Sequence, residues 1–167
     1  MIKMIFCSDI NGGIGFNNDL IYNSKEDMKF FREITNGHKV VMGYNTWVSL
    51  PKKPLPNRIN YILCDGECNI EENENVKILK NLSELVELGK NEDIFVIGGA
   101  QLYNSVIYED IVDEAYVTLV IDICHSADRF VHLYKMEENL TKRELLKSFK
   151  FAKQTYVLDA HIFKYTR

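Results

Sequence analysis

Stretches typical of β-strands alternate with stretches typical of helices through the first two thirds of this chain, and this order limits its possible folds more than any other feature. The strand-like stretches are rich in Ile, Val, Phe and Tyr and are bounded by Gly, Asn or Asp. Eight of them are found, at residues 2–10, 38–43, 59–64, 76–79, 93–99, 114–122, 148–153 and 156–166. Such alternation indicates a parallel α/β sheet that helices cover on both faces.

Four helical patterns complete this prediction. They cover residues 25–35, a short segment after Gly43, residues 82–89 and residues 100–108. The last two strands are separated only by Gln154 and Thr155, so we expect them to form an antiparallel hairpin at the edge of the sheet. A chain of 167 residues, 46% of them apolar, is long enough for one domain with a substantial core. The sequence therefore predicts a single α/β domain with a mixed, mostly parallel eight-stranded sheet flanked by about four helices.

The net charge and the apolar segments argue against several classes of protein. The formal net charge of -4 disfavours a nucleic-acid partner, because such proteins need a basic face. The longest uncharged run, residues 94–108, has fifteen residues and includes a Gly pair, so it falls short of a membrane span. Residues 1–10 carry one Lys, a brief apolar stretch and no small-residue cleavage site, so we expect no signal peptide. The expected location is the cytoplasm, and the expected partners are small molecules.

Four cysteines are scattered along the chain, namely Cys7, Cys64, Cys68 and Cys124. In a reducing compartment we expect all four to be free thiols. Cys64 and Cys68 are near each other, but without a second pair or a nearby His they do not form a metal-site pattern, so no metal is expected. Residues 65–75 contain five acidic residues and indicate a solvated surface loop.

Asp27 occupies an unexpected place in the first helical pattern. In the stretch NSKEDMKFFREI, Asp27 falls with Phe31 and Ile34 on the stripe that faces the core. Ser24 is suited to be the N-cap, so Asp27 can be explained as part of a capping box at the positive end of the helix dipole. The alternative is a catalytic or recognition acid, and the helix by itself favours the cap.

Two glycine turns join strands to helices. Gly98 and Gly99 stand between a strand and the helix at residues 100–108, and Gly43 with Thr46 repeats this arrangement. Ligands of such sheets bind beyond the carboxyl ends of the strands, where free amides at a helix start can receive phosphate oxygens. Two phosphate cradles suggest a dinucleotide. Each turn also fits an ordinary strand-to-helix connection, and neither matches the six-residue dinucleotide fingerprint.

Two further segments have features of binding sites. Three prolines stiffen the stretch that presents Arg58 ahead of a strand, and a rigidly held Arg suits forked recognition of a carboxylate. A solvated basic turn is the alternative interpretation, chiefly for Lys52 and Lys53. Residues 9–23 contain three glycines and four asparagines, and a loop of this length without secondary structure is usually a lid or a binding loop.

Five stretches in this order resemble dihydrofolate reductases, and the likeness spans nearly the whole chain. They are IGFNNDL at 14–20, DMKFF at 27–31, MGYNTWVSL with PLPNR at 42–58, VIGGAQLY at 96–103 and YVTLV at 116–120. The family fold is a mixed eight-stranded sheet flanked by helices, in agreement with the pattern above. The resemblance implies an NADPH-dependent oxidoreductase that reduces 7,8-dihydrofolate to 5,6,7,8-tetrahydrofolate in one-carbon metabolism. It also implies binding of antifolate-type small molecules. It does not imply an oligomer, so we expect a monomer.

The resemblance changes the interpretation of Asp27. This residue matches the family acid that pairs with the 2-amino group and adjacent ring nitrogen of the pterin, where burial is expected to raise its pKa and help deliver a proton to N5. Thr118 matches the hydroxyl that supports this acid, with a plain strand Thr as the alternative. Arg58 matches the arginine that binds the α-carboxylate of the glutamate tail, with Arg32 and Lys52 beside it.

The implied pockets are built from several stretches. The resemblance implies that the pterin and nicotinamide pockets are lined by Ile5, Cys7, Met28, Phe31, Leu50, Leu55, Ile97 and Tyr103. Most of these residues would lie in the core even in a protein that binds no ligand. The implied cofactor-binding residues are Ile14, Gly15, Asn18, Leu20, Gly43, Tyr44, Asn45, Thr46, Cys64, Asp65, Lys80, Ile97, Gly98, Gly99, Ala100, Gln101, Leu102 and Tyr103. The peptide joining Gly98 and Gly99 is implied to be cis.

The long loop departs from the family pattern. Ile21 and Tyr22 stand where the family usually has Pro-Trp. Tyr22 can still stack and form hydrogen bonds, so it is counted with Asp27 and Thr118 among the catalytic residues. Asp128 is the best match for the residue that steadies the closed lid.

The cofactor end departs further. Tyr44 and Asp65 stand where many members have basic or hydroxyl residues for the 2'-phosphate of NADPH, and Gln101 replaces a common Arg. An acid at a strand end favours a free ribose hydroxyl over a phosphate, and Lys80 is one remaining cation. We expect NADPH to be the cofactor, with weak discrimination against NADH.

Two rival interpretations stay open. The pyrimidine reductase of riboflavin synthesis shares this fold and its nicotinamide cradle, although the combination of Asp27 and Arg58 speaks against it. The second is a non-catalytic folate- or nucleotide-binding protein, or a structural protein of the same fold, which would suit the altered loop and the missing basic residues.

Overall fold

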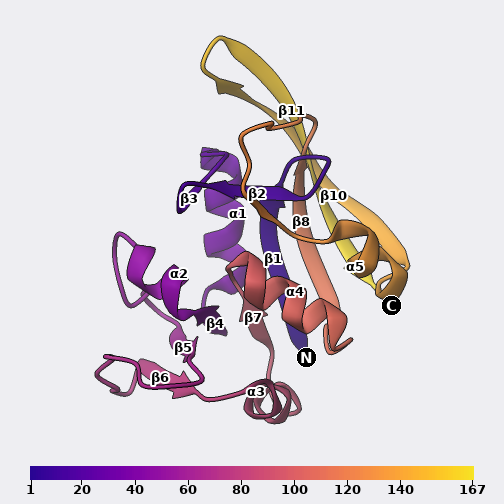
Figure 1. The fold of residues 1–167 in the computed structure, drawn as a ribbon. Helices are drawn as coiled ribbons and strands as arrows, with labels where there is room; N and C mark the ends of the chain where they lie inside the picture. Colours follow the sequence, from indigo (N-terminus) through magenta and orange to yellow (C-terminus); the bar gives the residue numbers. More distant parts are fainter.

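The computed structural model describes residues 1–167 as an α/β fold around an eight-stranded sheet with the strand order β10-β11-β8-β1-β7-β4-β5-β6 (Figure 1). The strands of this sheet are β1 (Ile2–Ser8), β4 (Lys39–Gly43), β5 (Ile59–Leu63), β6 (Val76–Leu79), β7 (Ile94–Val96), β8 (Glu114–Val120), β10 (Lys142–Lys153) and β11 (Tyr156–Thr166). From β8 to β6 neighbouring strands run parallel, whereas β11 is antiparallel to both β8 and β10. The predicted mixed, mostly parallel sheet with a C-terminal hairpin is confirmed.

The helices are α1 (Lys25–Thr35), α2 (Tyr44–Ser49), α3 (Leu82–Gly89), α4 (Ala100–Tyr108) and α5 (Leu133–Asn139). The first four coincide with the predicted patterns. The sequence does not predict α5, because its seven residues include one buried side chain, Met136, and its start has no side-chain cap. β10 begins at Lys142, earlier than the predicted start at residue 148. The prediction misses the first half of this strand because its side chains are exposed and show no alternation of buried and exposed positions. No helix has the length and apolarity that crossing a membrane requires.

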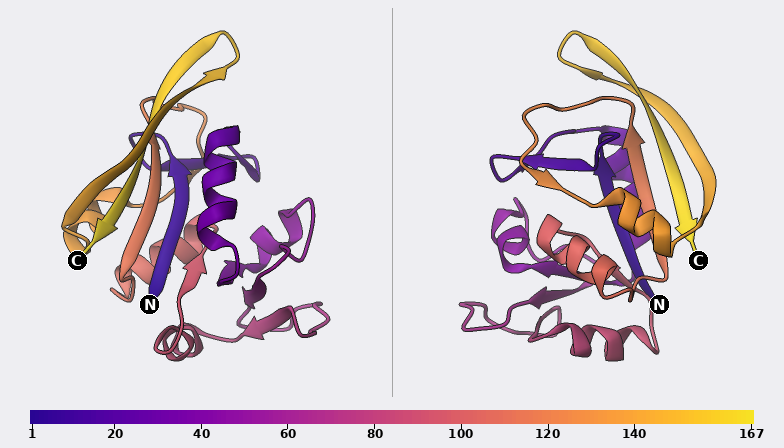
Figure 2. Two further views of the ribbon diagram at one scale, coloured as in Figure 1. Left: turned by 180° about the vertical axis from the view of Figure 1, so that it is seen from behind. Right: turned by 45° about the vertical axis from the view of Figure 1, so that its right-hand side comes forward.

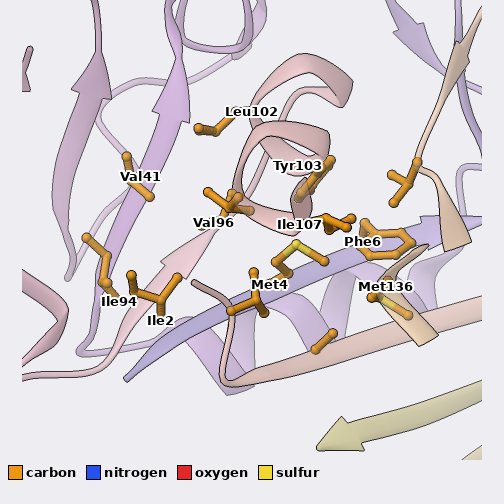
Figure 3. Packing of buried hydrophobic residues seen from close by; sticks show 14 of the residues in the cluster. Ile2, Met4, Phe6, Val41, Ile94, Val96, Leu102, Tyr103, Ile107 and Met136 are labelled. Atoms are coloured by element: carbon orange, nitrogen blue, oxygen red, sulfur yellow. The ribbon is translucent and has the colours of Figure 1, made fainter. Parts of the chain in front are cut away.

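Helices cover both faces of the sheet, and the central strand β1 divides its side chains between them. Met4 and Phe6 lie in the main buried cluster together with Tyr103 of α4 (Figure 3). Ile5 points to the opposite face, where a second cluster packs against Phe31 and other residues of α1. The two views of Figure 2 bring first α1 and then α4 to the front of the sheet.

The long loop at residues 9–23 contains strands, so the expectation of a loop without secondary structure is wrong. β2 (Gly13–Phe16) pairs with β3 (Asp19–Leu20) and with β9 (Arg129–Phe130) in a three-stranded antiparallel sheet. β2 and β3 lack the runs of β-branched residues that mark strands, and β9 comes from a distant part of the chain. The hairpin between β2 and β3 turns at Asn17 and Asn18, whose φ values of 53° and 64° suit a tight two-residue turn.

The prediction of four free thiols is wrong for one pair. Cys64 and Cys68 form a disulfide in the exposed loop after β5, whereas Cys7 and Cys124 are free. The Cα atoms of Cys64 and Cys68 lie 6.5 Å apart, because the chain turns back at Gly66 between them. Composition predicts the compartment and not the local turn, so it does not reveal such a pair.

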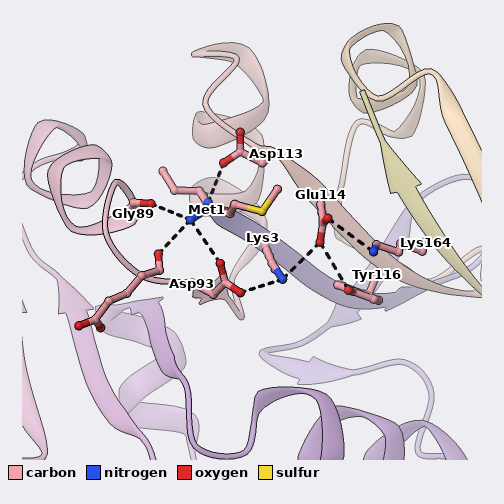
Figure 4. Close-up of polar contacts among 10 residues, drawn as sticks. Met1, Lys3, Gly89, Asp93, Asp113, Glu114, Tyr116 and Lys164 are labelled. Atoms are coloured by element: carbon pink, nitrogen blue, oxygen red, sulfur yellow. Dashed lines mark hydrogen bonds and ion pairs between the residues drawn. The ribbon is translucent and has the colours of Figure 1, made fainter.

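Charged groups tie the beginning of β1 between its neighbours (Figure 4). The amino group of Met1 donates to the carbonyl of Gly89 at 2.6 Å and lies 3.4 Å from Asp93. Lys3 bridges Asp93 at 3.0 Å and Glu114 of β8 at 3.3 Å. These contacts lie at the amino ends of the strands, so they are remote from the glycine turns at the carboxyl ends.

Candidate active site

Asp27 uses its backbone and its side chain for different purposes. Its amide donates to the Oγ of Ser24 at 3.3 Å, so Ser24 is the N-cap of α1 as predicted. Its carboxylate does not return to the cap, and instead Oδ1 accepts a hydrogen bond from the Thr118 hydroxyl at 2.5 Å. A capping box would have occupied that carboxylate at the helix start. The side chain is therefore turned toward the sheet.

Groups from three elements surround the Asp27 carboxylate. Thr118 of β8 is only 2% exposed and lies directly opposite Cys7 of β1. Burial raises the pKa of Asp27, and the hydrogen bond from Thr118 opposes this shift. Burial also raises the pKa values of Cys7 and Tyr103, and the negative charge of Asp27 adds to both shifts. The site therefore holds a carboxyl whose pKa is higher than that of an exposed aspartate.

An apolar surface lies beside this acid. It belongs to the second buried cluster, on the α1 face of the sheet, and includes Ile5, Phe31, Leu50, Leu55 and Ile97. Met28 lies on α1 and is exposed, and Cys7 is packed against a third cluster that contains Tyr22. A flat heterocycle with polar groups along one edge would suit an acid placed next to such a surface.

The two glycine turns lie against each other. The Gly43 amide donates to the Gly98 carbonyl at 2.9 Å, and the peptide between Gly98 and Gly99 is cis, as the resemblance implies. A Cβ atom on Gly99 would lie 3.3 Å from the Thr46 hydroxyl, so a larger residue would crowd the space between the turns. Both α2 and α4 begin without a side-chain cap, so the amides of Asn45 and its neighbours are free to bind oxygens.

Residues of the implied cofactor site differ in exposure. Tyr103 and Leu102 are buried, and Figure 3 shows both in the main cluster. The Tyr103 hydroxyl donates to the Ile5 carbonyl at 2.7 Å, which fixes α4 over β1. Ile14 and Gly15 are also buried, whereas six further members of the set are partly buried or exposed: Asn18, Leu20, Tyr44, Asn45, Ala100 and Gln101.

A cavity of about 700 Å³ lies where β5 and β6 end. Its lining includes the disulfide and the acids Asp65, Glu67 and Glu72, with Lys80 as its only cation. The structure therefore brings Asp65 and Lys80 together in the lining of one cavity. The surroundings of Lys80 are acidic rather than basic.

Arg58 is held rigidly near the end of α1. It is 9% exposed, and it donates to the Pro56 carbonyl at 2.8 Å and to the Thr35 hydroxyl at 3.3 Å. Burial and the nearby positive charge of Arg32 lower the pKa of Arg58. No carboxylate of the chain pairs with it, so its charge is available to a ligand. Lys52 is exposed.

The β2–β3 hairpin is tied to the loop between β8 and β9. Asp128 donates its amide to the Gly15 carbonyl at 2.9 Å, and its carboxylate accepts from the Asn17 amide at 3.0 Å. Asp128 therefore contacts this hairpin through both its amide and its carboxylate. Tyr22 is buried, and its hydroxyl donates to Asp122 at 2.9 Å, so this hydroxyl is not bonded to Asp27.

Two further acids of this region are not predicted by the sequence motifs. Asp9 is fully buried and Asp122 is the partner of Tyr22. Each stands at the end of a strand-like stretch, at residues 2–10 and 114–122, and an acid in that place is the signal that could have identified them. In the fold both lie where the lid joins the sheet.

Comparisons with known proteins agree with this geometry. The family model described as dihydrofolate reductase matches residues 1–161. A dihydrofolate reductase of Ureaplasma parvum is 33% identical over 150 residues, which cover 89% of this chain and 93% of the relative. A dihydrofolate reductase of Bacillus subtilis is 35% identical over 121 residues, which cover 72% of this chain and 69% of the relative.

A solved structure supports the fold independently. Dihydrofolate reductase from Enterococcus faecalis, complexed with NADP(H) and RAB-propyl, is 21% identical and has a TM-score of 0.76, with 100% of this chain and 96% of that chain covered. The strand order and the helices described above are thus those of a known architecture. From the extent of the family match and the identity to its relatives, the chain belongs to the dihydrofolate reductase family.

Proposed function

We propose that this protein reduces 7,8-dihydrofolate to 5,6,7,8-tetrahydrofolate with NADPH as the hydride donor. The observation that carries the proposal is the carboxylate of Asp27, which is bonded to Thr118 and lies beside an apolar surface. Arg58, rigid and without an acidic partner, supplies the positive charge that the glutamate tail of a folate requires. Membership of the family supports the same reaction.

In the proposed mechanism Asp27 binds and helps to protonate the substrate. Its carboxyl pairs with the 2-amino group and adjacent nitrogen of the pterin, and Thr118 holds it in place. Because burial raises the pKa of Asp27, a larger share is protonated near neutral pH than in an exposed acid, which favours proton delivery toward N5. NADPH supplies the hydride when it is bound.

The residues of the two glycine turns fit such a cofactor. The uncapped starts of α2 and α4 offer amide donors to the pyrophosphate, and the Thr46 hydroxyl lies next to the Gly98–Gly99 peptide. The resemblance to the family does not imply an oligomer, so we propose that the monomer is active. A cytoplasmic location is proposed on the ground that both proposed substrates belong to intracellular metabolism.

A spectrophotometric assay with dihydrofolate and NADPH tests the function. We expect oxidation of NADPH that depends on dihydrofolate and stops when an antifolate is added. Binding of the antifolate without any oxidation would instead favour the non-catalytic folate-binding protein. Oxidation with a ribosylated pyrimidine and none with dihydrofolate would favour the reductase of riboflavin synthesis.

The acidic cavity predicts a weak preference between cofactors. Asp65 and its acidic neighbours repel the 2'-phosphate of NADPH, and Lys80 is the single cation that opposes them. We therefore expect kcat/KM for NADPH to exceed that for NADH by less than about a thousandfold, which is roughly 4 kcal/mol. A Lys80→Gln variant should reduce the ratio of kcat/KM for NADPH to kcat/KM for NADH. The ratio of the two binding affinities, measured by quenching of Trp47 emission, should fall in parallel. Lys90→Gln, on the surface after α3, is the control, and a larger preference in the parent would contradict the prediction.

Removal of the Arg58 charge should weaken substrate binding. In Arg58→Leu we expect KM for dihydrofolate to rise by roughly thirty- to a hundredfold, because a hydrogen-bonded charge contributes about 2–3 kcal/mol. Steady-state kinetics with dihydrofolate and with a dihydropterin lacking the glutamate tail make the test specific, since only the first should respond. Lys147→Leu, an exposed basic residue of β10 outside the proposed site, is the control. An equal loss with both substrates would show that Arg58 supports the fold and not the tail.

A further inference from the structure

A polar cluster joins residues 10–22, the proposed lid, to the C-terminal hairpin formed by β10 and β11. The β10–β11 hairpin extends past the rest of the sheet, beyond the loop that follows β8 (Figure 1). Lys153 near the tip of this hairpin has its Nζ atom 4.8 Å from the centre of the Tyr22 ring and 3.9 Å from an Asp122 carboxylate oxygen. The same oxygen accepts the hydrogen bond of the Tyr22 hydroxyl at 2.9 Å. Three distant segments of the chain therefore meet around Tyr22.

Asp122 contacts both ends of the lid. Its carbonyl accepts a hydrogen bond from the Ile10 amide at 3.2 Å, and its carboxylate holds Tyr22. Ile10 and Tyr22 bracket the hairpin formed by β2 and β3. A single residue at the end of β8 thus fixes where the lid leaves the sheet and where it returns.

The Tyr22 ring is buried and packs against an aromatic side chain of the hairpin. It is 4% exposed and lies edge-on to Phe151, with ring centres 6.0 Å apart. Burial, together with the hydrogen bond to Asp122, raises the pKa of Tyr22, so the hydroxyl keeps its proton and remains a donor. This arrangement defines one position for the chain just before α1.

The position of Tyr22 bears on the proposed acid. Tyr22 is two residues ahead of Ser24, whose hydroxyl caps the helix that carries Asp27. Tyr22 also packs in the cluster that includes Cys7, and the charge of Asp27 acts on Cys7. A shift of Tyr22 would therefore move both the lid and the start of α1.

We propose that Asp122, steadied by Lys153 of the hairpin, is a positioning residue for the proposed reaction, because it fixes Tyr22 and both ends of the lid beside Asp27. Asp122 does not touch the proposed substrate and acts through Tyr22. The hairpin is then a part of the site's support rather than only an edge of the sheet. This inference rests on the proposed function for its kinetic consequence, and its structural part can be tested without turnover.

The experiment compares Asp122→Ala, Asp122→Asn and Tyr22→Phe with the parent protein. We expect kcat to fall by about tenfold in Asp122→Ala and in Tyr22→Phe while KM for dihydrofolate changes less than about twofold, because lid position governs the step after binding. Asp122→Asn should recover most of the rate, since its Oδ1 can still accept the Tyr22 hydrogen bond. Combining Tyr22→Phe with Asp122→Ala should cause no further fall below Asp122→Ala, because Tyr22→Phe removes only a hydrogen bond that Asp122→Ala already removes.

A second ion pair of the hairpin provides the control. Lys150 and Asp159 lie 3.6 Å apart on β10 and β11 and do not contact the lid. Lys150→Gln and Asp159→Asn should leave kcat unchanged. Additive effects of Tyr22→Phe and Asp122→Ala, or an Asn variant as slow as the Ala variant, would overturn the proposal.

Hydrogen–deuterium exchange gives a readout that does not depend on activity. Amides of the lid, residues 10–22, should exchange about tenfold faster in Asp122→Ala than in the parent, while amides of β1 and β7 should not change. If the parent turned over no dihydrofolate but the lid amides responded in this way, the proposed function would fail and the positioning role would stand. If the exchange rates of the lid amides were unchanged in Asp122→Ala, the positioning role would be wrong, whatever the activity of the parent protein.

Discussion

Asp27→Asn is expected to lower kcat/KM for dihydrofolate by a factor between about 10² and 10⁴ at neutral pH, while the protein still folds. Asn can accept the Thr118 hydrogen bond, but it cannot provide or relay a proton and pairs less well with a protonated pterin edge. Steady-state kinetics at saturating NADPH measure the change, and circular dichroism checks the fold. This is the largest functional effect that we expect from a single substitution.

The pH dependence of this variant gives a second signature. In the parent the rate should fall as the pH rises through the pKa of Asp27, because the protonated share is then lost. Burial raises that pKa, so the fall should occur at higher pH than for an ordinary carboxyl. A raised acid pKa also makes the free energy of unfolding decrease across the same interval, because the folded state binds more protons than the unfolded state. Asp27→Asn should remove both dependences.

Glu26 provides a matched control for Asp27. It is the preceding acid in the first turn of α1, and its carboxylate accepts from the Ser24 hydroxyl at 3.3 Å. Glu26→Gln should retain activity, because this side chain is not directed toward Thr118. If Asp27→Asn kept its activity within a few-fold of the parent, Asp27 would be a capping residue and the proposed mechanism would be wrong.

Asp9→Ala is expected to produce the largest loss of stability. The Asp9 carboxylate is 0% exposed and accepts hydrogen bonds from the amides of Asn11 at 2.9 Å, Gly13 at 2.8 Å and Cys124 at 2.8 Å. Truncation leaves the buried Gly13 amide and the partly buried amides of Asn11 and Cys124 without a partner, and a buried unsatisfied donor costs about 1–3 kcal/mol. We expect the free energy of unfolding to fall by about 3–5 kcal/mol, measured by urea denaturation.

The control for Asp9 lies in the same lid. Asp19 is exposed, and its carboxylate accepts only from the amide of the next residue, at 2.8 Å. Asp19→Ala should change the free energy of unfolding by less than about 0.5 kcal/mol. A similar small change in Asp9→Ala would mean that water replaces the carboxylate at the three amides.

The parts of the fold that the sequence predicts are those with local signals. The strands at residues 59–64 and 76–79 and the helix at residues 25–35 carry apolar periodicity and caps, and periodicity depends only on neighbours in the chain. The small sheet of β2, β3 and β9 depends on pairing between distant segments that contain glycine, which no local pattern records. The disulfide of the loop after β5 depends on a turn that composition does not describe.

The site was predictable to a similar extent. Its proposed acid, arginine and glycine turns follow from motifs, and the fold places Thr118 on Asp27 and Thr46 beside Gly99. The motifs do not include Asp9 and Asp122, because their roles come from bonds to backbone amides and to a tyrosine that only the folded chain brings near. A resemblance to a family identifies the residues that contact the ligand more readily than it identifies the residues that hold these ligand-binding residues in place.

The alternation along β1 limits how this protein can diversify. Neighbouring positions of that strand serve opposite purposes, since Met4 and Phe6 fill the main cluster whereas Ile5 faces the proposed pocket. Inserting or deleting one residue there would exchange the two sets at once and ruin both. Within β1, changes of ligand preference should therefore arise by substitution at every second position, and we expect deep mutational scanning of β1 to show tolerance with a period of two.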